Sequence, residues 1–555
     1  MEDPAKKIER LAIELTRIPS VVGTPGENDI TAYIMELIRA LPYFRENPRN
    51  AFTAPVKEDP LKRASVIAVI DAPGRPKEAV LLIGHTDTVG TSDYSALEHL
   101  ANDPQGLAEA LKSQKLDEAA ARDLASGDYI FGRGIFDMKA GVAALLCLLS
   151  DLSENTAALD KSLVFAFLPD EEGGSLGMLA AASAAAALAE SGGFSYCAAI
   201  DTDYMTGRHP EDSTNYVYIG SVGKLLPAFY VHGSPSHVGE AFRGLDANLI
   251  ASHIMRRIDL NPELCDVADG EITQPPISLR LKDTKQEYSV QTAGGSQLYF
   301  NFSTHVSEPD EVLARMAQEA KAAMEDALAE LGARHEAFLE ASGLPEAALP
   351  FKAHVMTYSE LKGAVDAETG GRLEEIVREY SEGAGSNEAD PRDFSLGLVM
   401  HVHKHLLDQS PKVIAFFSPP YYPHINVTGS DPAEKALIDA VRGAADEVRE
   451  RFGYDIAVRK FYPYISDLSY CRLPRQEGSI DALTRNMPAW GRRYDLPLDA
   501  ISRIAAPVVN IGPYGKDAHK PTERLCRRYS LDAMPEMLRR VVMNLAGCKS
   551  RKGNI

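Results

Sequence analysis

The sequence predicts an α/β protein, with a three-layer α/β/α domain that is interrupted by an inserted α+β sandwich domain. Short apolar strands alternate with helices through residues 1–220, and this alternation is typical of a mainly parallel sheet covered on both faces. From about Gly220 the order becomes strand, helix, strand, strand, helix, strand, which is typical of a small sandwich. The 555 residues are also too many for one ordinary core.

The elements of the first domain follow from apolar runs and helical spacing. Strands are predicted at 65–71, 79–84, 162–168 and 196–200, and helices at 5–18, 28–40, 141–149 and 175–190. The polar, alanine-rich segment 91–128 is expected to be a helical insertion. Residues 429–555, with predicted helices at 431–450 and 531–546 and a strand at 506–511, are expected to complete the first sheet.

The inserted domain is predicted to span 221–428, which leaves 1–220 and 429–555 as the two parts of the first domain. Strands are expected at 224–232, 277–288, 296–305, 351–360 and 413–417, and helices at 247–258 and 311–331. Residues 365–410 add further helical material, so the insertion is larger than a minimal sandwich.

Charge and composition exclude several classes of protein. The net charge is −21, with 58 basic and 79 acidic residues, which opposes binding to nucleic acids and to anionic membranes. No stretch has the length and apolarity of a signal peptide or a membrane span. The six cysteines are scattered, without a C-x-x-C pair, so we expect no disulfide framework and a reduced, cytoplasmic protein.

A histidine and an aspartate follow the second predicted strand directly. His85 and Asp87 are two residues apart, so both side chains point the same way on an extended backbone. A histidine that binds a metal commonly needs a carboxylate on its other ring nitrogen. By itself the pair is more often a buried structural contact.

Carboxylates follow two further elements. Asp137, in the glycine-containing segment 132–141, immediately precedes an apolar helix, where an aspartate most often serves as a helix cap. Asp170, Glu171 and Glu172 follow the strand 162–168. Three successive carboxylates at a buried strand end repel one another unless a cation or protons neutralise them, although a solvated acidic turn is the ordinary alternative.

Two more positions complete the set. Asp201 follows the strand 196–200, with Asp203 two residues later, and His519 lies in a glycine-containing loop after the last strand. Each is ordinary by itself. Together, histidines and carboxylates gather at the strand ends of one sheet, where α/β proteins bind ligands, and they are the ligand types that zinc accepts.

These motifs, in this order from His85 to His519, resemble those of the dinuclear zinc aminoacylase/carboxypeptidase family, the M20 peptidases. The resemblance covers nearly the whole chain, from Arg17-Ile18-Pro19-Ser20 to the HKPTER stretch that begins at His519. The segments 417–423 and 464–470 resemble a branch of the family linked to arginine utilisation. The resemblance therefore implies a zinc-peptidase-like catalytic domain with an inserted lid domain.

The resemblance implies two divalent ions, zinc in the first place, with cobalt or manganese as alternatives. It assigns five residues as metal ligands: His85, Asp137 as the bridge, Glu172, Asp201 and His519. The family often has Glu-Pro-Thr where this chain has Asp201-Thr202-Asp203, so the ligand could shift to Asp203, although Asp201 is preferred.

The resemblance also implies catalytic roles. Glu171 is expected to be the general base and Asp87 to orient His85. In the lid, His237 is expected to help stabilise the oxyanion, from its own subunit or from a partner, and Asn248 to contact substrate. Without the resemblance, His237 would be interpreted as a surface histidine.

The implied function is hydrolysis of an amide bond in a small amino-acid-like substrate, by a deacylase or peptidase linked to arginine utilisation and able to form a homodimer through the lid. The alternative is a non-catalytic relative that binds a metal or ligand. His401 and His405 share a helical face, but no carboxylate partner is evident, so we interpret them as an exposed patch.

Overall fold

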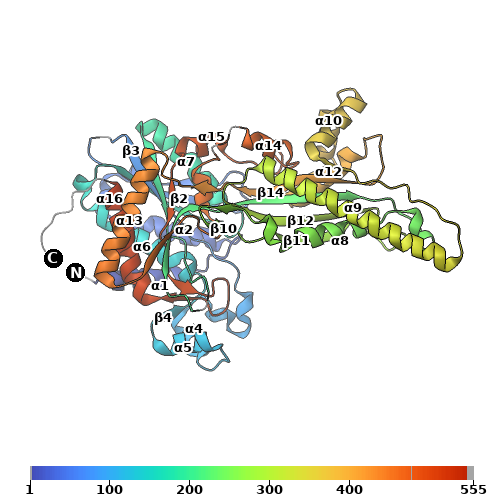
Figure 1. The fold of residues 1–555 in the computed structure, drawn as a ribbon. Helices are drawn as coiled ribbons and strands as arrows, with labels where there is room; N and C mark the ends of the chain where they lie inside the picture. The colour runs from blue at the N-terminus through green and yellow to red at the C-terminus, as the bar shows by residue number, and fades with distance from the viewer. Residues whose placement is uncertain (1–2, 75, 210, 475, 477, 547–555) are drawn as a thin grey trace. The chain divides into compact units, whose positions relative to one another are not determined.

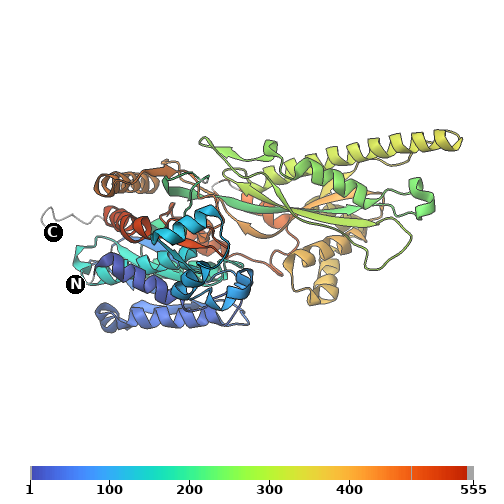
Figure 2. The ribbon, with the colours of Figure 1, turned by 90° about the horizontal axis from the view of Figure 1, so that it is seen from below.

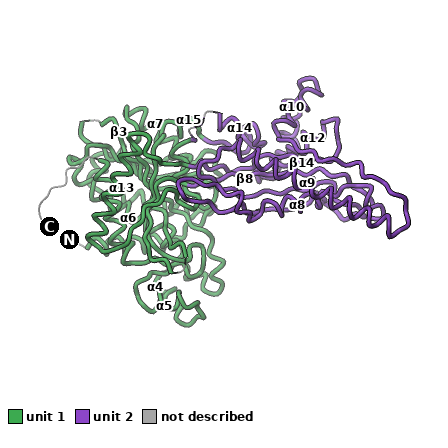
Figure 3. Tube along the Cα trace, viewed as in Figure 1, with its two compact units in different colours: residues 1–221, 425–473, 497–555 green, residues 222–424, 474–496 purple. Residues whose placement is uncertain are grey.

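The computed structural model describes residues 3–74, 76–209, 211–474, 476 and 478–546. The chain forms two compact units, unit 1 from residues 1–221, 425–473 and 497–555, and unit 2 from residues 222–424 and 474–496 (Figure 3). The main insertion begins and ends close to the predicted limits. The assignment of 474–496 to the first domain is wrong, because the backbone N–H of Phe417 donates to Asn486 and Ala489 lies in the core of unit 2.

A nine-stranded mixed sheet forms the centre of unit 1 (Figure 1). Its path runs β1-β2-β5-β3-β6-β17-β7-β15, and β16 pairs with β7. The four strands β5, β3, β6 and β17 are parallel to one another, so their carboxyl ends meet at one edge. The strands are β1 (Ala51–Pro55), β2 (Ala64–Ile70), β3 (Glu78–His85), β5 (Ser162–Leu168), β6 (Ser195–Asp201), β7 (Asn215–Ser221), β15 (Ile425–Asn426), β16 (Ile456–Arg459) and β17 (Val508–Asn510).

Helices cover both faces of this sheet and produce the predicted three-layer α/β/α arrangement (Figures 1 and 2). The helix α6 is almost wholly buried because it is apolar on every side. It packs with α1, and α13 packs with α16, while α7 packs with α15. The helices are α1 (Pro4–Thr16), α2 (Gly26–Ala40), α3 (Pro42–Glu46), α6 (Ala140–Ser153), α7 (Leu176–Gly192), α13 (Pro432–Phe452), α15 (Leu498–Ile504) and α16 (Met534–Leu545).

The segment 91–128 forms the helical insertion that its composition predicts. It contains a 3₁₀ segment, η2 (Ser92–Leu100), and the helices α4 (Pro104–Leu111) and α5 (Glu118–Ser126), and it has a small core around Tyr94 and Leu107. Beside it, β4 (Tyr129–Phe131), β18 (Gly515–Lys516) and β19 (Arg524–Cys526) form a three-stranded sheet.

Unit 2 is built on a five-stranded sheet in the order β11-β12-β8-β14-β13. Alternate residues of β8 face opposite sides, so Phe229 packs against Phe300, whereas Ala228 and Tyr230 join the core formed with the helices α10 (Tyr358–Thr369), α11 (Leu373–Glu382) and α12 (Pro391–His403). The strands are β8 (Gly223–His232), β11 (Ile277–Asp283), β12 (Gly295–Thr304), β13 (Val355–Thr357) and β14 (Lys412–Tyr422), with a separate pair β9 (Val267–Ala268) and β10 (Glu271–Ile272).

The helices of unit 2 depart from the prediction in two places. The long helix extends over 34 residues, beyond the predicted 311–331, and the predicted strand 351–360 is reduced to β13 because Thr357 and Glu360 form a capping box that begins α10. The helices are α8 (Ala247–Ile258), α9 (Pro309–Ser342), α10 (Tyr358–Thr369), α11 (Leu373–Glu382), α12 (Pro391–His403) and α14 (Ser479–Arg485).

Two general expectations can be compared with the described residues. Within them, no helix combines the length and the apolar character needed to cross a bilayer. The cysteines Cys147, Cys197, Cys265, Cys471 and Cys526 are free thiols, and Cys548 lies outside the described residues.

Candidate metal centre

The charged side chains gather at the edge where the parallel strands end. His85 is the last residue of β3, Asp201 is the last residue of β6, and Glu171 and Glu172 lie in the turn after β5. Asp137 precedes α6, and His519 lies in the loop between β18 and β19. The ends of parallel strands in α/β sheets are the usual place for ligand binding.

Asp137 is the centre of the cluster. Its Oδ1 lies 3.0 Å from His85 Nε2, and its Oδ2 lies 2.9 Å from His519 Nε2. His519 Nε2 is also 2.9 Å from Glu172 Oε1. The two oxygens of one carboxylate therefore each face a different histidine.

Three overlapping groups of ligand atoms each lie within 4.8 Å of one another. The groups are His85–Asp137–Asp203, His85–Glu171–Glu172 and Asp137–Glu172–His519. Asp137 belongs to two of them. The donors are imidazole nitrogens and carboxylate oxygens, a set that suits zinc and similar divalent ions, so the residues present fit the metal that the family resemblance implies.

Most of these donors are buried. Asp137 and Asp203 are each 4% exposed and His85 is 3% exposed, whereas the side chain of His519 is 46% exposed. The cluster is therefore open to solvent beside His519. His519 also has a positive φ of 63°, which a non-glycine residue rarely adopts outside a functional or strained loop.

The pKa shifts in the cluster follow from crowding. Burial, together with the charges of Asp137 and Asp201, raises the pKa of Asp203 well above its usual value, and burial raises the pKa of Glu172. Hydrogen bonds to Asp137 and Glu172 raise the pKa of His519 to about 10. The crowded carboxylates thus favour a positive partner at this position, which protons or a divalent cation could supply.

Asp87 contacts the turn after β5 through both oxygens of its carboxylate. Its Oδ1 and Oδ2 accept hydrogen bonds from the backbone N–H groups of Glu171 at 3.1 Å and Glu172 at 3.0 Å. His85 Nδ1 lies 3.2 Å from the carbonyl oxygen of Asp87 and 3.6 Å from its Oδ1. Asp87 therefore links the strand end that carries His85 to the turn that carries the two glutamates.

Asp203, and not Asp201, lies among the ligand atoms. Asp203 Oδ1 is 4.0 Å from His85 Nε2. The carboxylate of Asp201 instead accepts hydrogen bonds from Ser466 Oγ at 2.9 Å and from the backbone N–H of Thr202 at 2.7 Å. In this arrangement Asp203 lies nearer than Asp201 to the other ligand atoms, because both oxygens of Asp201 already accept hydrogen bonds.

Glu523 is a residue whose role the sequence did not reveal. It is fully buried, its Oε1 accepts from the backbone N–H of Gly134 at 2.8 Å, and its Oε2 accepts from Arg133 at 2.8 Å. Gly134 has φ 76°, and a Cβ there would lie 2.3 Å from the methyl group of Thr88. Glu523 thus fixes the turn that carries Asp137. Its place in the HKPTER stretch, four residues after His519, was the available clue.

Aromatic rings adjoin the cluster and were also not assigned from the sequence. The ring of Tyr204, next to Asp203, lies 4.8 Å from that of Phe136 and 5.1 Å from that of Tyr464. Burial and the charges of Asp137 and Asp203 raise the pKa of Tyr204. Tyr464 is 36% exposed and Tyr204 is half-buried, so these two rings form an aromatic wall beside the carboxylates, whereas Phe136 is fully buried.

The two remaining predicted residues belong to unit 2. His237 is exposed, and its Nδ1 accepts the backbone N–H of Gly239 at 3.1 Å. Asn248 is exposed near the start of α8, and its Oδ1 accepts from Ser296 Oγ. Their catalytic and substrate-binding roles remain predictions.

Residues 81–478 match the family described as Peptidase family M20/M25/M40. The chain belongs to this family. It is 33% identical to protein RocB of Bacillus subtilis (strain 168) over 543 residues, which are 98% of this chain and 95% of RocB. The predicted resemblance to the family is confirmed, and the chain is similar to RocB over nearly its whole length.

Two further comparisons extend this result. The chain is 30% identical over 239 residues to a succinyl-diaminopimelate desuccinylase of Methylobacterium sp. (strain 4-46), covering 42% of this chain and 50% of that enzyme. Aminopeptidase PepT from Bacillus cereus ATCC 10987 has the same fold, with a TM-score of 0.52, 13% identity and coverage of 98% and 99% of the two chains. The chain is therefore an M20-type hydrolase with a catalytic and a lid domain.

Proposed function

We propose that this chain is a dinuclear metallohydrolase that cleaves an amide bond in a small amino-acid-derived substrate. The observation that carries the proposal is the position of Asp137, whose two oxygens face His85 and His519 separately. A carboxylate that bridges two ions directs each oxygen toward a different ion, and a histidine beside each oxygen would supply a further ligand to each ion.

The ligands divide between two ions in this proposal. His85 and Asp203 would help to hold one ion, Glu172 and His519 would help to hold the other, and Asp137 would contact both. Zinc suits these donors best, and cobalt and manganese accept the same set. Asp87 and Glu523 hold the ligands in place through their hydrogen bonds.

Glu171 is the proposed general base. It lies with His85 and Glu172 in one group of ligand atoms, but it is outside the group around His519, so it remains available for proton transfer. When bound, two divalent ions would supply an acidic water and a clamp for the substrate carbonyl. Glu171 would remove a proton from the attacking water and deliver it to the leaving nitrogen.

The substrate class follows from similarity and from the aromatic wall. The desuccinylase similarity favours an N-acyl amino acid, and the RocB similarity favours a compound of arginine utilisation. Tyr204 and Tyr464 would pack against the apolar part of such a substrate.

The lid would contribute His237 to the oxyanion and Asn248 to substrate contacts, with His237 supplied by the same chain or by a second copy. An exposed edge supports a homodimer. Strand β11 lies at the edge of the sheet of unit 2, and its residues Leu279 and Leu281 are 53% and 46% exposed. An unpaired apolar edge strand favours pairing with another copy.

The test is a metal titration of chelator-treated protein, assayed against N-acyl amino acids and dipeptides. We expect turnover that depends on zinc, cobalt or manganese. Glu171→Gln should lower kcat by about 10²- to 10⁴-fold without loss of bound metal, because it removes proton transfer while preserving the shape of the side chain. Glu172→Gln is the matched control, and it should lower metal content as well.

The proposal fails if no member of the substrate panel is turned over in a metal-dependent way, or if Glu171→Gln retains full activity. A protein that binds two ions but is inactive toward the whole panel would favour the non-catalytic alternative. The complete set of ligands and base makes this alternative the weaker hypothesis.

A further inference from the structure

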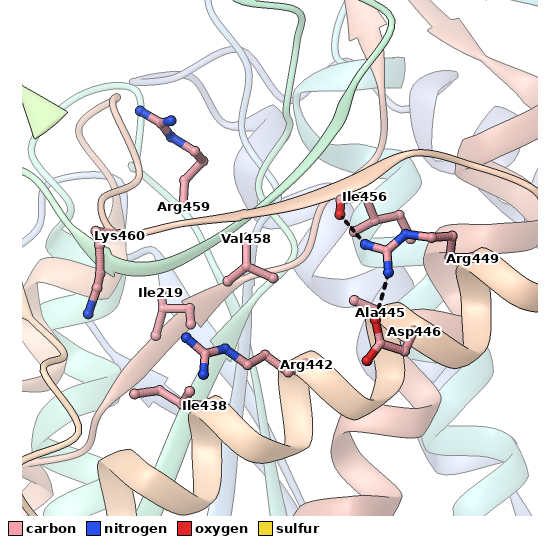
Figure 4. A pocket seen from close by; sticks show the side chains of 10 residues that line it. All are labelled: Ile219, Ile438, Arg442, Ala445, Asp446, Arg449, Ile456, Val458, Arg459 and Lys460. Carbon is pink, nitrogen blue, oxygen red and sulfur yellow. Dashed lines mark hydrogen bonds and ion pairs between the residues drawn. The ribbon is translucent and has the colours of Figure 1, made fainter. Parts of the chain in front are cut away.

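A cavity of 290 Å³ lies on unit 1, away from the metal ligands, between the helix α13 and the strands β7 and β16 (Figure 4). Ile219, Ile438 and Val458 form an apolar part of its lining. Arg442 and Arg449 come from α13, and Lys460 follows β16. No residue of the proposed catalytic site contributes to it.

The basic residues of this cavity differ in how they are held. Arg449 donates to Asp446 Oδ1 at 2.6 Å and to the carbonyl oxygen of Ile456 at 2.8 Å, and Lys460 Nζ donates to the carbonyl oxygen of Val427 at 2.9 Å. Asp446, the one acidic residue of the lining, is therefore already paired. The side chains of Arg449 and Lys460 are thus held in position by hydrogen bonds.

Arg442 is different. Its guanidinium forms no hydrogen bond or ion pair with any residue in the described part of the chain, and Figure 4 shows it directed into the cavity beside Ile219 and Ile438. The chain carries 79 acidic residues against 58 basic ones, so carboxylate partners are abundant on its surface. An arginine left unpaired here, above an apolar lining, is a binding group that a ligand can use.

The sequence explains the arrangement. Ile438, Arg442, Ala445 and Arg449 follow one another at intervals of four, three and four residues, so they share one face of α13. On this face, Ile438 and Ala445 line the same cavity as the guanidinium of Arg442.

We propose that this cavity binds a small organic anion with two negative charges, of the phosphate-monoester or dicarboxylate class. Arg442 would form a charge-assisted contact with one end of the anion, since a guanidinium matches the geometry of both groups. Arg449 and Lys460 would add positive charge, and the isoleucines would contact the carbon skeleton. The site is separate from the metal centre and does not depend on the proposed catalytic function.

The test is isothermal titration of the metal-loaded protein with phenyl phosphate and, separately, with succinate. We expect binding of at least one anion, weakened at least tenfold by Arg442→Gln. Lys435→Gln is the matched control, because Lys435 is an exposed cation on the same helix but outside the cavity, and it should bind as the unchanged protein does. The anion that binds more tightly identifies the class.

Two results would overturn the proposal. One is the absence of binding of both anions at millimolar concentrations. The other is binding that Arg442→Gln leaves unchanged, since the anion would then sit elsewhere, such as on the metal ions. Because Arg442 is exposed on the helix, the variant should fold normally, and an unchanged thermal unfolding curve verifies this.

Discussion

Unit 1 contains two adjacent clusters of buried carboxylates that are neutralised in different ways. In one, the guanidinium of Arg63 contacts Asp59 at 3.0 Å, Glu27 at 3.1 Å and also Asp170. Burial and the nearby charge of Asp87 raise the pKa of Glu27 to about 7. This cluster is satisfied by the protein's own side chains.

The other cluster, around Asp137, has only histidines as partners. Among the described residues, no lysine or arginine forms an ion pair with Asp137, Glu172 or Asp203. The first cluster contains its own permanent counter-charge, which suits a structural role. The second has only titratable histidines as partners and contains the groups of ligand atoms that could hold a metal ion.

The largest expected effect concerns the carboxylate cluster around Arg63. Arg63→Met should lower the free energy of unfolding by about 3–5 kcal/mol, because it leaves buried carboxylates without their counter-charge. Urea unfolding should show the same loss with and without zinc, since the network contains no metal. Arg503→Met, which breaks an exposed pair with Glu190, is the control and should cost at most about 1 kcal/mol. A loss that vanishes in zinc would mean that Arg63 acts through the metal centre.

The next effect distinguishes Asp201, the last residue of β6, from Asp203 by metal content. In metal-free protein, Asp203→Asn should raise the unfolding temperature, because the pKa of Asp203 is raised and its ionised form is costly there. In zinc, the same variant should lose one of two ions. Asp201→Asn should keep both, because Asp201 contacts Ser466 instead. The zinc content of each variant after dialysis distinguishes the two aspartates. Loss of an ion in Asp201→Asn but not in Asp203→Asn would identify Asp201 as the ligand.

A smaller effect concerns the support of Asp137. Glu523→Ala should weaken zinc binding about 10- to 100-fold, as removal of a residue that orients a ligand typically does, while Glu523→Gln should lose less because it still accepts the N–H of Gly134. Competition with a chromogenic chelator measures both. Equal zinc affinity in the unchanged chain and in both variants would show that the turn carrying Asp137 keeps its conformation without Glu523.

The smallest effect is a dependence on pH. A histidine whose folded pKa is raised contributes stability that is complete below its unfolded pKa and is lost as pH rises through the folded value. His519, with a pKa of about 10, therefore predicts that metal-free protein loses stability between about pH 6.5 and pH 10. Zinc should restore more stability at pH 9 than at pH 6.5, and His519→Ala should flatten the metal-free profile. Thermal unfolding at several pH values measures this.

The strand ends could be predicted from the sequence, because the apolar run of β3 ends at His85 and that of β5 ends two residues before Asp170. The choice between Asp201 and Asp203 could not be predicted from the sequence. It depends on tertiary contacts, because Asp201 contacts Ser466 whereas Asp203 lies near His85. Glu523 was missed for the same reason, as its partners Arg133 and Gly134 are almost 400 positions earlier in the chain. The segment 474–496 was misplaced because its contacts with α9 and β14 are tertiary.

The central claim is that Asp137 bridges two divalent ions. The most direct measurement is the zinc content of dialysed protein by mass spectrometry, for the unchanged chain and for Asp137→Ala. Two ions per unchanged chain, and loss of both ions in the variant at the same free zinc concentration, are the predicted results. One ion or none in the unchanged chain, or two ions retained without Asp137, would contradict the account.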